Sequence, residues 1–266
     1  MNRNSELVEH GLSIWRERYS LKMIPVAEEI ILRRDMVTLL QFVNENKVVG
    51  TQSTGNMPLK MIRSVTAQFV NPPILDNKIG DRVYRLRTEN DVWPLYYLHV
   101  LAEVGGLLDT KPSRLWRVTK RGKDFLEAHA LSQALYLLRI WWYEVNWLIA
   151  YPYTGMGDDL PPFFNYHVLE SLLSLKPNTR ISAEKFSSEL IKKTGLVWGA
   201  PDSDHVDMFL QSGIERMAIK ILASFGVLET IEQDRSLHGV PMSKLVSFKL
   251  TPFGRALLEA LAVLSQ

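Results

Sequence analysis

Two short stretches of the chain, 132 positions apart, repeat the same pattern of residues. Residues 115–126 read LWRVTKRGKDFL and residues 247–258 read SFKLTPFGRALL. In both, a threonine follows a strand-like run, a glycine comes three residues later, and an apolar pair follows the glycine at the same spacing. A threonine hydroxyl can cap the next helix, and glycine lets a neighbouring segment approach that helix closely. The repeated strand–helix junction predicts two similar domains.

A second pair of matching segments lies upstream of each junction. Residues 106–108 (GLL) match residues 226–228 (GVL), and an apolar, helix-like segment precedes each. The separation is 120 positions here and 132 at the junction, so the second hairpin is predicted to be twelve residues longer. The alternative is that each copy is an ordinary strand followed by a helix, with no relation between the two.

Three helices, a two-stranded hairpin and a further helix are predicted in each half. This order is the plan of a winged-helix domain. We therefore predict a mostly α-helical chain with tandem winged-helix-like domains, short β-hairpin wings and a long central helix. Asp35 is the predicted N-cap of the first helix of the first domain. The predicted divisions are a helical arm at 1–35, a first domain at 36–150, a connector at 151–165 and a second domain at 166–266.

Several motifs of the first domain also follow one another in a fixed order. They are residues 50–60 (GTQSTGNMPLK), 106–108 (GLL), 119–122 (TKRG), 141–142 (WW) and 145–147 (VNW). Over roughly residues 36–150, this set resembles a family of uncharacterised bacterial winged-helix proteins that carry Thr-Gly-Asn-Leu-Pro before the second helix. Met57 departs from that pattern, which has leucine there. Similar modules occur in helicase-associated bacterial proteins. The resemblance implies a fold and brings no catalytic residues.

The central stretch 124–150 has no proline or glycine and is rich in good helix formers, which predicts one long helix. It contains Trp141, Trp142 and Trp147, and Trp is enriched at protein interfaces, so these three are candidate partner-binding residues. The alternative is that both domains pack on this helix and bury the indoles. Arg139 and Glu144 interrupt the most apolar run, which argues against a membrane span.

The predicted first wing is strongly basic. Six cations and no acidic residue lie between positions 111 and 123, namely Lys111, Arg114, Arg117, Lys120, Arg121 and Lys123. Such a wing can contact phosphates, and the alternative is a hairpin edge protected by charge. In the second domain, the candidate nucleic-acid-binding residues are Lys192, Lys193, Arg216 and Lys220. The third helix of the first domain lacks the Arg, Lys, Asn or Gln that read base edges, so no sequence preference is predicted.

The sequence offers little support for catalysis or metal binding. It has no cysteine, which excludes disulfides, thiolate nucleophiles and Cys-type zinc sites. The run Asp202, Asp204, His205 and Asp207 lacks the glycine and the distal glutamate of a calcium loop, so a helix-capping loop is favoured. His99 lies among apolar residues and is expected to be satisfied and semi-buried rather than a base. We expect no enzyme activity, no cofactor and no metal.

The net charge bears on the kind of partner that the chain can bind, and the first residues bear on its compartment. The net charge is only +2, so an acidic partner would have to bind a local patch. The first residues lack the apolar core of a signal peptide, which predicts a cytoplasmic protein. We expect a non-enzymatic protein that contacts double-stranded DNA phosphates through basic wings. The alternative is a protein-interaction adaptor, an assembly subunit or a homo-oligomer that uses the aromatic helix.

Overall fold

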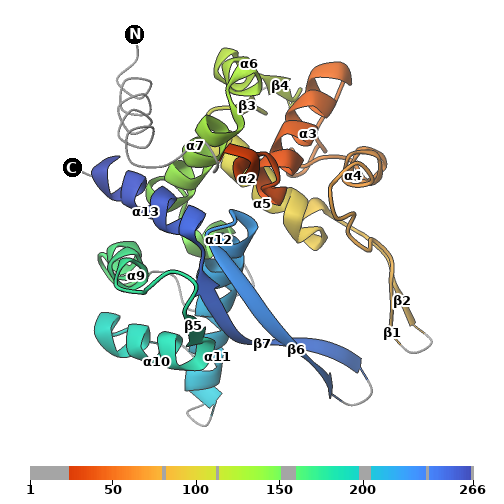
Figure 1. Cartoon of the computed structure of the whole chain (residues 1–266). Coiled ribbons are helices and arrows are strands. Elements are labelled where there is room, and N and C mark those ends of the chain that lie inside the picture. The colour runs from red at the N-terminus through yellow and green to blue at the C-terminus, as the bar shows by residue number, and fades with distance from the viewer. Residues whose placement is uncertain are drawn as a thin grey trace. The chain divides into compact units, whose positions relative to one another are not determined.

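A computed structural model of the chain describes residues 24–79, 82–111, 114–150, 160–197, 205–237 and 240–264 (Figure 1). The described chain is mostly helical, with short antiparallel sheets, as predicted. It divides into two compact units. The first unit is Glu28–Val145, and the second contains Asn146–Gln266. The short helix α2 (Ile24–Glu28) leads into the first unit.

The first unit has three main helices, a hairpin and two further helices, with a small extra hairpin before the third helix. Its elements are α3 (Ile31–Glu45), α4 (Leu59–Thr66), β1 (Asn77–Ile79), β2 (Arg82–Tyr84), η2 (Glu89–Asp91), α5 (Trp93–Val104), β3 (Leu108–Asp109), β4 (Arg117–Val118), α6 (Lys120–Glu127) and α7 (Ala130–Tyr143). Strands β1 and β2 pair antiparallel, with Lys78 opposite Val83.

Helix α3 is the centre of the first unit. Met36, Leu39, Leu40 and Val43 recur at three- and four-residue spacing and are all buried. The helix packs against α4, α5, α6 and α7. The prediction that Asp35 caps this helix is wrong, because α3 begins at Ile31. Asp35 instead lies inside the helix, buried, and its Oδ1 accepts a hydrogen bond of 2.8 Å from the Val70 amide.

A third segment joins the first wing. Strands β3 and β4 pair antiparallel, with Leu108 opposite Val118. Val49, between α3 and α4, forms an antiparallel bridge with Leu115. The Gly50 amide donates to the Arg114 carbonyl at 2.7 Å, so the segment before α4 lies along the outer end of the wing.

The second unit repeats this arrangement with longer strands. Its elements are α8 (Trp147–Ala150), α9 (Phe164–Leu173), β5 (Arg180–Ser182), α10 (Ala183–Thr194), α11 (Val206–Ile214), the π-helical turn η4 (Glu215–Ile219), α12 (Lys220–Ser224), β6 (Leu228–Leu237), β7 (Val240–Leu250) and α13 (Pro252–Leu264). The sheet order is β5-β7-β6. Strand β5 places Ser182 opposite Ser247, and Ser247 aligns with Leu115 in the sequence repeat.

The two strand–helix junctions have the same geometry. Thr119 Oγ1 accepts from the Gly122 amide at 2.9 Å and donates to the Gly106 carbonyl at 2.7 Å. Thr251 Oγ1 accepts from the Gly254 amide at 2.8 Å and donates to the Gly226 carbonyl at 2.8 Å. In each unit, one hydroxyl therefore caps the helix that follows the hairpin and bonds it to the turn that precedes the hairpin. The predicted capping role of both threonines is confirmed.

Both glycines of the junction lie against main chain. A Cβ at Gly122 would stand 2.3 Å from the Leu107 carbonyl oxygen, and one at Gly254 would stand 2.1 Å from the Val227 oxygen. Neither position has room for a side chain, and backbone atoms cannot move aside as a flexible side chain can. The close approach predicted from sequence is present in both units.

The second hairpin is twelve residues longer than the first, as predicted, because Leu228 pairs with Leu250 where the first hairpin pairs Leu108 with Val118. Strands β6 and β7 pair from Leu228 and Leu250 out to Leu237 and Val240, so the added length lies in the paired strands. A bulge between Ile231 and Glu232 interrupts the register. Helix α11 continues through Gly213 and passes into the π-helical turn η4.

The prediction of a long central helix is wrong. The stretch forms three separate helices, α6, α7 and α8. Ala128 and His129 adopt extended backbone between α6 and α7, and Gln133 Nε2 donates to the Phe125 carbonyl at 2.7 Å across this corner. Glu144 ends α7, and the boundary between the two units falls after Val145. Helix propensity alone could not reveal this corner, because it is stabilised by interactions made after the chain turns.

The junction geometry predicts how much each threonine contributes to stability. Replacing Thr119 or Thr251 by alanine is expected to lower the free energy of unfolding by roughly 1–2 kcal/mol, because a helix cap and a second hydrogen bond are removed together. Urea denaturation of each variant would measure the loss. Thr179→Ala is the control: Thr179 is exposed, so a change within about 0.5 kcal/mol is expected. Losses no greater than that of the control would contradict the double role.

Candidate nucleic-acid interface

The six cations of the first wing lie on one continuous piece of the fold. Lys111 follows β3, Arg114 precedes β4, and Arg117 lies in β4. The other three occupy the first turn of α6, which the Thr119 cap joins directly to the hairpin; they are Lys120, Arg121 and Lys123. All six are exposed. None of them forms an ion pair with another residue in the described part of the chain.

Two of these arginines are held by main-chain interactions. Arg121 Nη1 donates to the Gly105 carbonyl at 3.3 Å, so its guanidinium lies along the end of α5. Arg114 has a φ of 59°, a left-handed conformation that is uncommon outside glycine. Its carbonyl accepts from Gly50, so pairing with the segment before α4 holds the turn. The Arg114 main chain is therefore held by a hydrogen bond, although its basic side chain is exposed.

The four predicted cations of the second unit have different surroundings. Lys193 Nζ lies 2.8 Å from Glu170 Oε2, and Lys220 Nζ lies 3.2 Å from Glu215 Oε1. Lys220 is also 3.7 Å from a carboxylate oxygen of Glu232. Lys192 and Arg216 are exposed on α10 and η4. At least half of this set is therefore already neutralised by carboxylates of the same unit.

Helix α5 has the composition of a packing helix. It contains no lysine or arginine, and its buried residues include Leu95, Tyr97 and Leu101. Trp93 and Tyr96 remain half-exposed, with ring centroids 6.4 Å apart. This supports the expectation that the helix does not present base-reading side chains.

A buried ionic network lies beneath the wing. His99 Nδ1 is 2.6 Å from Glu89 Oε1, and His99 Nε2 is 3.7 Å from Glu103 Oε1. The Glu89 side chain is completely buried, and its Oε2 accepts from the Met57 amide at 2.6 Å. Thr110, at the end of β3, donates its hydroxyl to Glu103. The network therefore reaches from the start of α4, through α5, to the wing.

The network shifts two pKa values in opposite directions. Burial opposes the charged form of His99, but the carboxylates of Glu103 and Glu89 outweigh it and raise the pKa of His99 from 6.5 to about 9. His99 lowers the pKa of Glu103 from 4.5 to about 2, against the effect of burial and with help from the Thr110 hydroxyl. Both groups are ionised across the neutral range.

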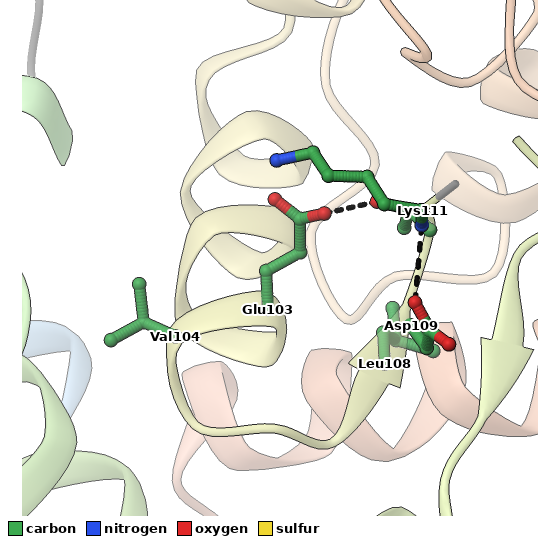
Figure 2. Close-up of a pocket in the computed structure, with 6 residues that line it drawn as sticks. Glu103, Val104, Leu108, Asp109 and Lys111 are labelled. Atoms are coloured by element: carbon green, nitrogen blue, oxygen red, sulfur yellow. Dashed lines mark hydrogen bonds between the residues drawn. The ribbon is translucent and has the colours of Figure 1, made fainter.

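The outer end of this network opens into a surface pocket of about 370 Å³ (Figure 2). Its lining comes from the last turn of α5 and from β3 with the residues after it, namely Glu103, Val104, Leu108, Asp109, Thr110 and Lys111. Asp109 Oδ1 accepts from the Lys111 amide at 3.1 Å and shapes the start of the wing turn. In Figure 2 the Glu103 carboxylate is directed toward the segment that carries Lys111, where it accepts the Thr110 hydroxyl.

Sequence reasoning found His99 but missed its partners. His99 is buried and its Nδ1 is hydrogen-bonded to Glu89, whereas Nε2 has no hydrogen-bond partner within the described residues, so the expectation of a satisfied ring holds for one nitrogen. The spacing of His99 and Glu103, four residues apart on one helix, was a signal that the two side chains could meet. Glu89 precedes His99 by ten residues in an irregular segment, so no periodic pattern could have linked it to the histidine.

The other candidate residues from the sequence are the three tryptophans and the acidic run before α11, and the described residues do not bring them together into a site. Trp141 and Trp142 in α7 are 1% exposed, and Trp147 in α8 is 4% exposed. Trp147 packs edge-on against Phe164, with ring centroids 5.9 Å apart.

Asp202 and Asp204 lie outside the described residues; His205 and Asp207 are at the start of α11. No cluster of three metal-ligating side chains occurs within the described ranges.

A comparison with protein-family models, curated proteins and solved structures finds no match to this chain. Among the helices that the structure describes, none combines the length and apolar character needed to cross a bilayer.

The buried network predicts how stability depends on pH. The raised pKa of His99 stabilises the fold fully below pH 6.5, and this contribution is lost as pH rises toward 9. The free energy of unfolding should therefore fall over that interval, by at most about 1.4 kcal/mol per pH unit for one proton. Glu103 acts in the opposite direction: its contribution is lost as pH falls from 4.5 toward 2.

Chemical denaturation between pH 6 and 9 would measure the alkaline loss. His99→Gln should remove it, whereas His129→Gln, at an exposed histidine, should retain it. The same pH slope in the His99→Gln variant and in the wild type would show that His99 is not its source.

Proposed function

We propose that the chain is a tandem winged-helix protein that binds double-stranded DNA through phosphate contacts from its first wing, without catalysing a reaction. The observation that carries the DNA proposal is the set of six exposed cations, free of ion pairs within the described ranges, on the hairpin and the first turn of α6. Exposed lysines and arginines that keep their charge are the groups that neutralise phosphates and release counterions.

The winged-helix part of the proposal rests on the matching order of elements in the two units. In the second unit, strand β5 between the first two helices pairs with the second strand of the hairpin, and in the first unit Val49 bridges Leu115, just before the second strand. A threonine then caps the following helix in both copies. Both features accompany the order helix, helix, helix, hairpin, helix, which is the winged-helix plan.

The proposed contacts are to the DNA backbone and not to base edges. Base readout needs donors and acceptors on a helix that enters the major groove. Helix α5 carries apolar and aromatic residues where such donors would lie. Phosphate contacts position a protein but carry no sequence information, so we propose non-specific affinity that depends strongly on salt.

The first unit is proposed to contribute more than the second. Lys193 and Lys220 already pair with carboxylates, and binding a phosphate would require those pairs to break. Lys192 and Arg216 remain as secondary candidates. The adaptor alternative rested on Trp141, Trp142 and Trp147, and their burial favours a core role for the three indoles.

Titration of a random-sequence duplex at several salt concentrations tests the DNA proposal. Replacing Arg114, Arg117, Lys120 and Lys123 with alanine should weaken binding uniformly across sequences. The salt slope should fall by roughly one for each of these cations that meets a phosphate in the wild type. Arg121 is left in place because its side chain also bonds to the end of α5.

A charge-matched control removes four exposed lysines elsewhere, at positions 60, 176, 185 and 244. This variant should keep the wild-type salt slope. Absence of wild-type binding at low salt would refute DNA binding, and equal losses in both fourfold variants would refute the assignment to the wing.

A further inference from the structure

The His99 ring is enclosed by negative charge on both nitrogens. Nδ1 faces Glu89 at 2.6 Å, and Nε2 faces Glu103 at 3.7 Å. A neutral imidazole has only one N–H, so one of its nitrogens would direct a lone pair at a carboxylate. Only the doubly protonated ring presents an N–H to each carboxylate. At 3.7 Å the contact to Glu103 is an ion-pair contact and not a hydrogen bond, and Nε2 has no hydrogen-bond partner within the described residues; the two flanking carboxylates therefore favour a buried cation at this position.

The network reaches the first strand of the wing through Glu103. Thr110 lies at the end of β3, is buried, and donates its hydroxyl to the same carboxylate that faces His99. The next residue, Lys111, is the first cation of the wing, and its charge also favours the ionised form of Glu103. The position of Lys111 is thus fixed one residue away from a buried ionic contact.

The same ring also contacts the other side of the wing. Trp116 precedes β4, is 2% exposed, and lies with its ring centroid 4.1 Å from that of His99. An indole face attracts a cation, which favours the protonated ring here. Trp116 Nε1 donates to the Gly55 carbonyl at 3.0 Å, so the indole is itself held in place.

We propose that His99 is a positioning residue for the basic wing: its buried imidazolium holds Thr110, through Glu103, and Trp116, and these two residues flank Lys111 and Arg114 in the chain. The proposed consequence for function rests on the DNA-binding proposal above. A turn held at both ends presents its cations in one arrangement, so less conformational entropy is lost when they meet phosphates.

The second wing provides an internal comparison. With the separation of 120 positions that aligns Gly106 with Gly226, His99 corresponds to Ile219 and Glu103 to Ala223. Ile219 is buried, so this position is apolar in the second unit. The second wing has a ladder of ten residue pairs, whereas β3 and β4 share two. The short wing, which has little main-chain pairing of its own, is the one beside the ionic network.

Removing the Thr110 hydroxyl tests the link without disturbing the buried charges. Thr110→Val keeps the shape of the side chain and leaves His99 between its two carboxylates. Thr110→Ser restores a hydroxyl. The matched control is Thr66→Val, because Thr66 is also buried in the first unit but donates only to the Ile62 carbonyl of its own helix.

Amide hydrogen exchange is the direct measurement. In Thr110→Val, exchange should quicken at least about tenfold at the amides of Lys111, Trp116 and Gly50, which are bonded within or to the wing. Exchange in α3 and α13 should remain at wild-type rates. Thr110→Ser should return the wing amides to within about threefold of wild type, and Thr66→Val should leave them unchanged.

Two results would overturn the proposal: unchanged exchange at the wing amides in Thr110→Val, or acceleration that is equal throughout the chain. The latter would mean a general loss of stability rather than release of the wing. Affinity for a random duplex, measured on the same variants, should fall several-fold in Thr110→Val and recover in Thr110→Ser. If the wild type binds no DNA, the functional proposal fails, while the exchange data still decide whether the link from Thr110 to the network holds the wing.

Discussion

Each unit depends on one threonine hydroxyl that bonds in two directions. Thr119 and Thr251 receive the amide of the helix that follows the hairpin and donate to the glycine carbonyl before it. The two bonds fix the angle between hairpin and helix, and the glycine three residues later lets the helix lie directly on main chain. In the first unit, this junction joins the cations of the hairpin directly to those in the first turn of α6.

The interactions that the sequence could reveal are those between residues close along the chain. The Thr–Gly junction spans four residues, so its pattern was legible, and its repetition indicated two related units. The corner at Ala128 and His129 could not be predicted, because the Gln133 side chain bonds across it only after the chain has turned. Helix propensity described the local preference correctly on each side of that corner and could not locate it.

The candidate site also has one part that the sequence revealed and one part that it did not. The basic run from 111 to 123 was visible as composition, and the structure finds these side chains exposed. What lies beneath them depends on Glu89, which reaches His99 from an irregular segment and also receives the Met57 amide. Such a network is costly to bury, and it is tolerated because nearly every charge in it has a partner. In the proposed role of His99, the benefit that offsets this cost is a single wing geometry.

The bulge in the second wing has a consequence for how such hairpins can change length. Ile231 pairs with Ser247 and Glu232 with Leu245, so Val246 has no partner opposite it. Phe248 and Leu245 are both buried although they are three residues apart, a spacing that would place them on opposite faces of an unbroken strand. One extra residue in a strand changes which of its alternating side chains face a given side of the sheet. The outer part of the hairpin can be extended or shortened while the base keeps its apolar face on the helices. The length of the wing can therefore change without altering how its base packs.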